Sequence, residues 1–133
     1  MYTVDLDVTA GTRDPAETEG LEAAAGDPLP EGVTPASEGE VVEKLKECFD
    51  PEIPVNIYDL GLIYDLEIGS NGNIDVVMTL TAPACPVAGS MPAMVARAIS
   101  DLSNTGRASV TLTWDPPWSM ELMSEDARLA LGF

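Results

Sequence analysis

Apolar and polar residues alternate along three stretches of this chain, and each has the period of a β-strand with one buried face. The first two stretches, 62–68 and 74–81, are separated by GSNGN, whose residues tolerate a positive φ. That sequence predicts a hairpin turn and an antiparallel pair of strands. The third stretch, 109–114, lies farther along the chain and ends at DPPW, which cannot continue a strand.

A first helix is predicted to begin after Ser37. Ser37 followed by Glu40 fits a capping box, in which each residue bonds the backbone N–H of the other. The helix should end at Asp50-Pro51, because proline pushes the residue before it out of the α region. Its predicted apolar face carries Val41, Leu45, Cys48 and Phe49.

A second helix is predicted between the second and third strands. Ser90 is expected to cap it, and Pro92 suits a first turn, where its missing N–H is harmless. Its predicted buried face carries Met91, Met94, Val95, Ala98, Ile99 and Leu102. A short last helix should begin at Ser124 and end before Gly132.

The order helix–strand–strand–helix–strand, followed by a short C-terminal helix, predicts an α+β fold. We expect a two-layer sandwich with a small, mixed, three-stranded sheet and helices on one face. The helical crossover should be right-handed and should place the third strand parallel to the second. This pattern does not determine the strand order.

Residues 1–36 are rich in Gly, Pro, Ala, Thr and acidic residues, and we expect them to form a mobile acidic leader. Such a composition buries too little apolar surface to offset the entropy of ordering. Tyr2 to Val8 alternates weakly, so docking of that stretch as an edge strand stays open. The folded domain is predicted to span residues 37–133.

Composition restricts the function. The chain has 23 acidic and 6 basic residues and a formal net charge of −17, which argues against nucleic acid and membranes as partners. No apolar run approaches the ~18–20 residues that span a bilayer, and the N-terminus lacks a signal pattern, so we expect a cytoplasmic protein. The chain contains no histidine, which excludes imidazole metal ligands and Cys–His nucleophile pairs.

Cys85 is the residue that most suggests chemistry. It lies between Pro83 and Pro86, a few residues before the second helix, whose N-terminus would lower the pKa of the thiol. Prolines limit the geometries of the loop, which suits a metal ligand or a nucleophile. The alternative is a buried cysteine that acts as a small hydrophobe. Cys48, on the apolar face of the first helix, is expected in the core.

Three carboxylates lie in loops that are expected at the same end of the sheet. Asp59 precedes the first strand, and hairpin geometry places it near Thr81 and Cys85. Asp50 and Glu52 follow the first helix and could reach the same end. Carboxylates near a thiolate become useful once a cation is present. The alternative for Asp50 and Asp59 is turn and cap chemistry.

Three segments in order resemble the SufT-like iron–sulfur cluster assembly proteins: DPEIPVNIYDLGLIYDLEI, MTLTAPACPVAGSMPAMVARAI and VTLTWDPPWSMELMSEDARLALG. The resemblance covers about residues 38–132. It implies a compact α+β domain that acts in metal–sulfur cluster maturation, in the SUF system, without substrate turnover of its own. The family's motif residues fall on Asp50, Pro51, Glu52, Pro54, Asp59, Leu60, Gly61, Thr79, Thr81, Cys85 and Pro86.

The resemblance therefore implies an accessory factor for iron–sulfur cluster assembly or delivery, not an enzyme. Cys85 would be the metal ligand, Asp50, Glu52 and Asp59 would contact the cluster or a partner, and Thr79 and Thr81 would hydrogen-bond the loop. Clusters need four ligands, usually cysteines, so we expect iron or a cluster to bind transiently, with no organic cofactor. A scaffold protein, an apo client or a second copy in a homodimer would supply the other ligands.

Two other functions remain open from the sequence. One is a thiol-dependent enzyme with Cys85 as its nucleophile. The other is a non-catalytic interaction module, in which the acidic leader recruits a basic partner and Cys85 is incidental.

Overall fold

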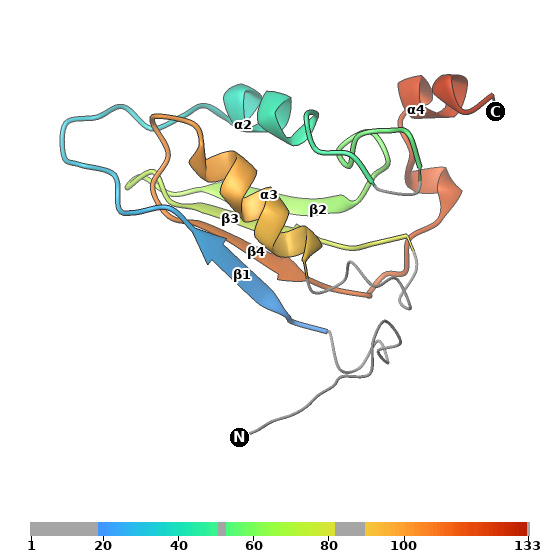
Figure 1. Ribbon diagram of the computed structural model, residues 1–133, viewed down its shortest axis with the longest axis horizontal. Coiled ribbons are helices and arrows are strands. Elements are labelled where there is room, and N and C mark those ends of the chain that lie inside the picture. Colours follow the sequence, from blue (N-terminus) through green and yellow to red (C-terminus); the bar gives the residue numbers. More distant parts are fainter. Residues whose placement is uncertain (1–18, 51–52, 82–89, 133) are drawn as a thin grey trace.

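A computed structural model describes residues 19–50, 53–81 and 90–132. Its centre is a four-stranded sheet in the order β1-β4-β3-β2. The strands are β1 (Glu22–Ala25), β2 (Ile63–Ile68), β3 (Ile74–Met78) and β4 (Ala108–Leu112). β2 and β3 form the predicted antiparallel hairpin, and β4 runs parallel to β3 as predicted. The α+β class is confirmed, and Figure 1 shows α2 and α3 on one face of the sheet.

The sheet has four strands, where the sequence pattern predicted three. The additional strand, β1, comes from the segment 1–36 and pairs antiparallel with β4, with Ala23 opposite Val110. Its sequence, EAAA, has no apolar–polar alternation, so the period-two pattern could not reveal it. Ala36 is buried as well. The alternating stretch Tyr2–Val8 lies outside the described residues.

The helix α2 (Glu38–Leu45) begins with the predicted capping box. Ser37 Oγ accepts from the Glu40 N–H at 3.2 Å, and the Glu40 carboxylate accepts from the Ser37 N–H at 2.9 Å. The helix ends at Leu45, five residues before Asp50, so the predicted helix was too long at its C-terminal end. As a consequence Phe49 is 54% exposed and does not lie on the buried face.

The helix α3 (Met91–Ser100) buries most of its predicted face. Met94 is the exception, at 41% exposed, because the buried stripe is centred on Met91, Val95 and Ile99. Ser90 precedes the helix without a capping hydrogen bond from its side chain. The short helices η3 (Met120–Leu122) and α4 (Glu125–Ala130) end the chain, and α4 is capped by Ser124 as predicted.

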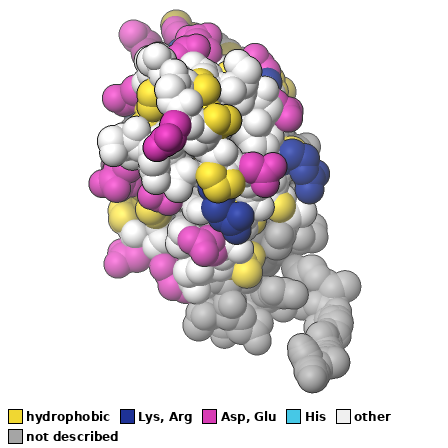
Figure 2. Space-filling view, turned by 90° about the vertical axis from the view of Figure 1, so that its left-hand side faces the viewer, with side chains coloured by type: hydrophobic (Ala, Val, Ile, Leu, Met, Phe, Trp, Pro, Cys, Tyr) yellow, Lys and Arg dark blue, Asp and Glu magenta, His cyan; other side chains and the backbone are white. Residues whose placement is uncertain are grey.

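The core lies between the sheet and the helices α2 and α3. Side chains of β3 and β4 that face the helices are fully buried: Ile74, Val76, Met78, Ala108, Val110 and Leu112. The opposite face of the sheet carries polar and acidic residues, including Glu67 directly across from Asp75. Figure 2, a view onto the end with the β2–β3 turn, shows acidic side chains spread widely and few basic ones.

Candidate functional site

Three described segments meet at one end of the sheet, on the right in Figure 1. They are the loop before β2, the residues directly after β3 and the segment after β4. β3 and β4 are parallel, so their carboxyl ends share an edge, and antiparallel β2 begins at that edge. The Thr79 N–H donates to Leu62 O at 2.8 Å, and the Thr113 N–H donates to Met78 O at 2.8 Å. The loop before β2 and the residues after β3 therefore lie together, as hairpin geometry predicted.

Asp59 is held within its own turn. Asn56 Oδ1 accepts from the Asp59 N–H at 2.8 Å, and Asn56 Nδ2 donates to Asp59 Oδ2 at 2.8 Å. The Leu60 N–H then donates to Asn56 O at 3.0 Å. These bonds are the turn chemistry that the sequence left open as an alternative.

Asp50 has a comparable structural role. It is only 6% exposed, and its Oδ1 accepts from the Ile53 N–H at 3.1 Å. Its backbone N–H donates to Val55 O at 3.4 Å, and the Ile57 N–H donates to Cys48 O at 2.8 Å. Two further candidate residues from the sequence, Glu52 and Cys85, lie outside the described residues.

Thr79 and Thr81 follow β3. Thr79 is fully buried, and its hydroxyl acts on the Tyr64 hydroxyl, although Oγ1 meets no strict hydrogen-bond geometry within the described ranges. Thr81 is half-buried and is the last described residue before the cysteine segment.

The segment after β4 packs across the Asp59 turn, which the sequence did not predict. Trp118 Nε1 donates to Leu60 O at 2.7 Å, and the Ser124 N–H donates to Asp59 O at 2.8 Å. Gly61 has a φ of +82°, and a Cβ there would collide with the Leu122 backbone. Only glycine fits this contact. The single signal in the sequence was Gly61 itself, directly after Asp59-Leu60.

Tyr64 adds a further link between β2 and the same segment. Its hydroxyl donates to Pro116 O at 2.7 Å. Burial raises the pKa of Tyr64 above its ordinary value; the Thr79 hydroxyl opposes this rise, and the Asp115 carboxylate adds to it. The phenol therefore stays neutral and acts as a structural donor at neutral pH.

Cys48 lies in the core, as predicted. It is 6% exposed, and its Sγ lies 3.8 Å from Lys44 O. Burial raises the pKa of the Cys48 thiol, Glu47 adds to the rise, and Lys44 opposes it. A buried, protonated thiol is a poor nucleophile and a poor metal ligand.

Within residues 19–50, 53–81 and 90–132, no three carboxylate or thiol side chains come together as a metal site. Asp50 and Asp59 form hydrogen bonds within their own turns. In the same part of the chain no helix is long and apolar enough to cross a membrane.

Comparison with known proteins identifies the family. Residues 38–112 match the model of the family described as "Iron-sulfur cluster assembly protein". The chain is 43% identical over 97 residues to an Fe-S protein maturation auxiliary factor of Porphyromonas gingivalis, covering 73% of this chain and 92% of that protein. It is 37% identical over 92 residues to the Fe-S protein maturation auxiliary factor YitW of Bacillus subtilis, covering 69% of this chain and 90% of that protein.

A solved structure agrees in fold. The crystal structure of a domain of unknown function from Bacillus anthracis superposes with a TM-score of 0.68 at 37% identity, over 72% of this chain and 92% of that one. The family model and these relatives place the chain in the iron–sulfur cluster assembly protein family.

Proposed function

We propose that this protein is an accessory factor for iron–sulfur cluster assembly or delivery, and that Cys85 is the thiolate that contacts the cluster. The observation that carries the proposal is the family match over residues 38–112, which includes the cysteine segment. The related proteins of Porphyromonas gingivalis and Bacillus subtilis are named Fe-S protein maturation auxiliary factors. The cluster is cargo in this proposal, and the protein turns over no small molecule.

Covalent geometry supports a location for Cys85 at the loop end of the sheet. Four residue steps join Thr81 to Cys85, so their Cα atoms lie within about 14 Å of each other. The segment also begins at the carboxyl edge of β3 and returns at Ser90, before α3. Thr79, whose buried hydroxyl meets no strict hydrogen-bond geometry within the described ranges, is a further proposed donor to this segment.

One thiolate cannot hold a cluster alone, because the common clusters have four ligands. We propose that a scaffold protein, an apo client or a second copy supplies the others during transfer. Asp50 and Asp59 shape the adjoining loops, and with Glu52 they are proposed contacts for the cluster or the partner. A cytoplasmic location is part of the same proposal.

Replacing Cys85 with serine tests the proposal. Serine is nearly isosteric with cysteine, so the free energy of unfolding should change by less than about 1 kcal/mol and the thermal midpoint should shift little. Cells that carry Cys85→Ser should accumulate iron–sulfur enzymes that are present but poorly loaded with cluster. Cys48→Ala is the matched control, since it removes the other thiol and should spare cluster loading wherever the protein still folds.

Other outcomes separate the alternatives. Loss of turnover of a small molecule, with normal cluster loading elsewhere, would support a thiol-dependent enzyme. Normal cells would support an interaction module with an incidental Cys85. Anaerobic reconstitution with iron and sulfide, followed by absorbance and native mass spectrometry, measures direct binding and shows whether two copies share a cluster.

A further inference from the structure

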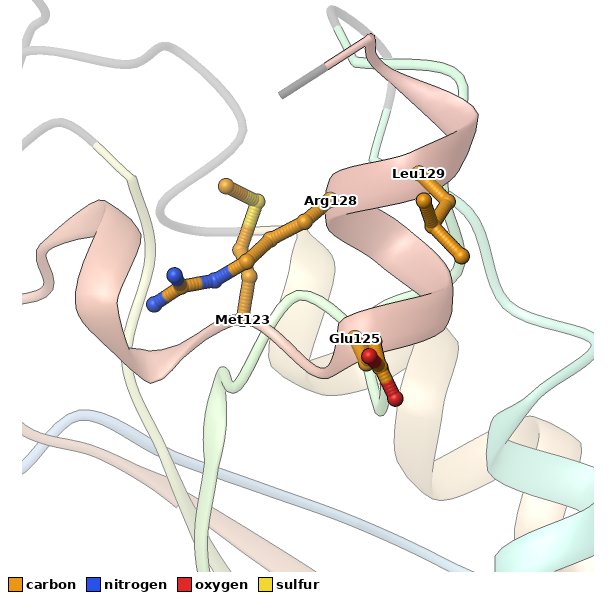
Figure 3. A pocket seen from close by; sticks show the side chains of 4 residues that line it. All are labelled: Met123, Glu125, Arg128 and Leu129. Carbon is orange, nitrogen blue, oxygen red and sulfur yellow. The ribbon is translucent and has the colours of Figure 1, made fainter.

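Two hollows lie along α4 and the residues just before it, and we call them together the C-terminal groove. The smaller, about 270 Å³, is lined by Met120, Glu121, Met123 and Arg128. The larger, about 420 Å³, is lined by Met123, Glu125, Arg128 and Leu129. They share Met123 and Arg128 as lining residues, and Figure 3 shows the Arg128 side chain extending from α4 toward η3.

The groove is held in shape by contacts that do not need a ligand. Arg128 Nη2 donates to Glu121 O at 3.1 Å and to Met120 O at 3.4 Å, which fixes the guanidinium against η3. Ser124 caps α4 through the Ala127 N–H. Met123 is only 6% exposed and lines both hollows. A groove that is already formed loses little conformational entropy when it binds.

Exposed apolar side chains concentrate in the segment that forms this groove. Met120 is 54% exposed, Leu122 is 42% exposed and Leu129 is 68% exposed. The described residues contain seven large apolar side chains that are exposed, and three of them lie within this ten-residue stretch. Single exposed apolar residues are ordinary, but a group beside a formed groove indicates a contact surface.

The rim of the groove is acidic. Glu121 and Glu125 line it, Asp126 lies next to Glu125 on α4, and all three are exposed. The one cation of the groove, Arg128, is already bonded to two carbonyl oxygens. A second copy of this chain, with its net charge of −17, would bring the same carboxylates against this rim. A basic partner would have complementary charge.

We infer that the C-terminal groove binds a segment of a partner protein that carries two apolar side chains flanked by Lys or Arg. One apolar side chain fills each hollow, and the basic side chains pair with the rim carboxylates. The inference goes beyond the proposed role of Cys85, because every residue that carries it lies in the C-terminal segment.

The test uses fluorescein-labelled synthetic peptides and the full chain, with binding followed by fluorescence anisotropy. One peptide repeats Leu and Lys with the period of an amphipathic helix, and its partner replaces every Lys with Glu. At physiological ionic strength the Debye length is about 8 Å, so distant charges contribute little. The Leu–Lys peptide should bind at least about tenfold more tightly than the Leu–Glu peptide.

Matched variants locate the binding. Glu121→Lys with Glu125→Lys should weaken binding of the Leu–Lys peptide by about tenfold. Glu67→Lys with Asp75→Lys makes the same change of net charge on the open face of the sheet and should have less than about a twofold effect. Leu129→Ser should also weaken binding, whereas Val33→Ser, at an exposed apolar residue elsewhere, should not.

Five results would overturn the inference, four from the binding experiments and one from NMR. The four are absence of peptide binding, equal binding of the Leu–Glu peptide, equal losses in the two charge-reversal pairs, and self-association of the chain that Leu129→Ser abolishes. Methyl NMR of the unsubstituted chain should show shifts at Met123 and Leu129 on addition of the Leu–Lys peptide, and shifts confined to other sites would also contradict it. The Cys85→Ser variant should bind the peptide normally. The peptide test can therefore fail without the test of the cluster role failing, and the reverse also holds.

Discussion

The strand β1 should contribute measurably to stability, although it comes from a segment whose composition is typical of disorder. It forms four register pairs with β4, from Glu22–Thr111 to Ala25–Ala108. Beyond the strand, the Gly20 N–H donates to Leu112 O at 2.7 Å, and the Leu112 N–H donates to Leu21 O at 2.8 Å. Removing these contacts should destabilise the fold.

The expected magnitude follows from the backbone bonds. Roughly three or four hydrogen bonds, at a net contribution of about 1 kcal/mol each, give about 3–4 kcal/mol for loss of residues 19–26. For a domain of this size, about 4 °C per kcal/mol predicts a fall in the thermal midpoint of about 12–16 °C. A mobile leader over residues 1–36 predicts a change within about 4 °C, so the two expectations differ clearly.

The assay compares two truncated chains by thermal and urea unfolding. Deletion of residues 1–18 is the reference, and deletion of residues 1–26 additionally removes β1. A point variant gives a second test: Ala25 packs against the core and Ala24 is exposed on the other face, so Ala25→Asp should cost about 1–3 kcal/mol and Ala24→Asp less than about 0.5. Equal midpoints for the two truncations would refute a structural role for β1.

Three further predictions concern the loop end of the sheet. Trp118→Phe removes the donor to Leu60 O and should cost about 1–2 kcal/mol in urea unfolding, and an unchanged midpoint would show that this bond is dispensable. Gly61→Ala should cost about 2–4 kcal/mol, because φ is +82° and a Cβ meets backbone; a stable, correctly folded variant would contradict the contact. Brief alkylation at neutral pH, followed by peptide mass analysis, should label Cys85 before Cys48, whose pKa is raised by burial; the reverse order would count against the proposed site.

The elements with strong local signals could be predicted from the sequence. The capping box of Ser37 and Glu40 depends on residues three apart, so the start of α2 follows from local sequence. The β2–β3 hairpin follows from two alternating stretches and a turn in which Gly72 has a φ of +86°. The parallel position of β4 follows from the helical crossover alone.

The candidate site could be predicted only in part. Hairpin geometry indicated that the Asp59 turn and the end of β3 lie together, and the structure agrees. Whether Asp50 and Asp59 serve ligation or turn chemistry stayed open, because both uses need a carboxylate in a loop. The hydrogen bonds to Ile53 and Asn56 show the turn chemistry, which only the positions of the side-chain atoms in the structure reveal.

The tertiary structure alone decided β1 and the packing of the C-terminal segment. EAAA carries no periodic signal. It becomes a strand because β4 offers an unpaired edge and because α3 packs against a strand in that position. The contacts of Trp118 with Leu60 and of Leu122 with Gly61 join residues about sixty positions apart. Local propensity reports on neighbours within a turn or two of chain, whereas these contacts depend on surfaces that exist only after the sheet and helices have assembled.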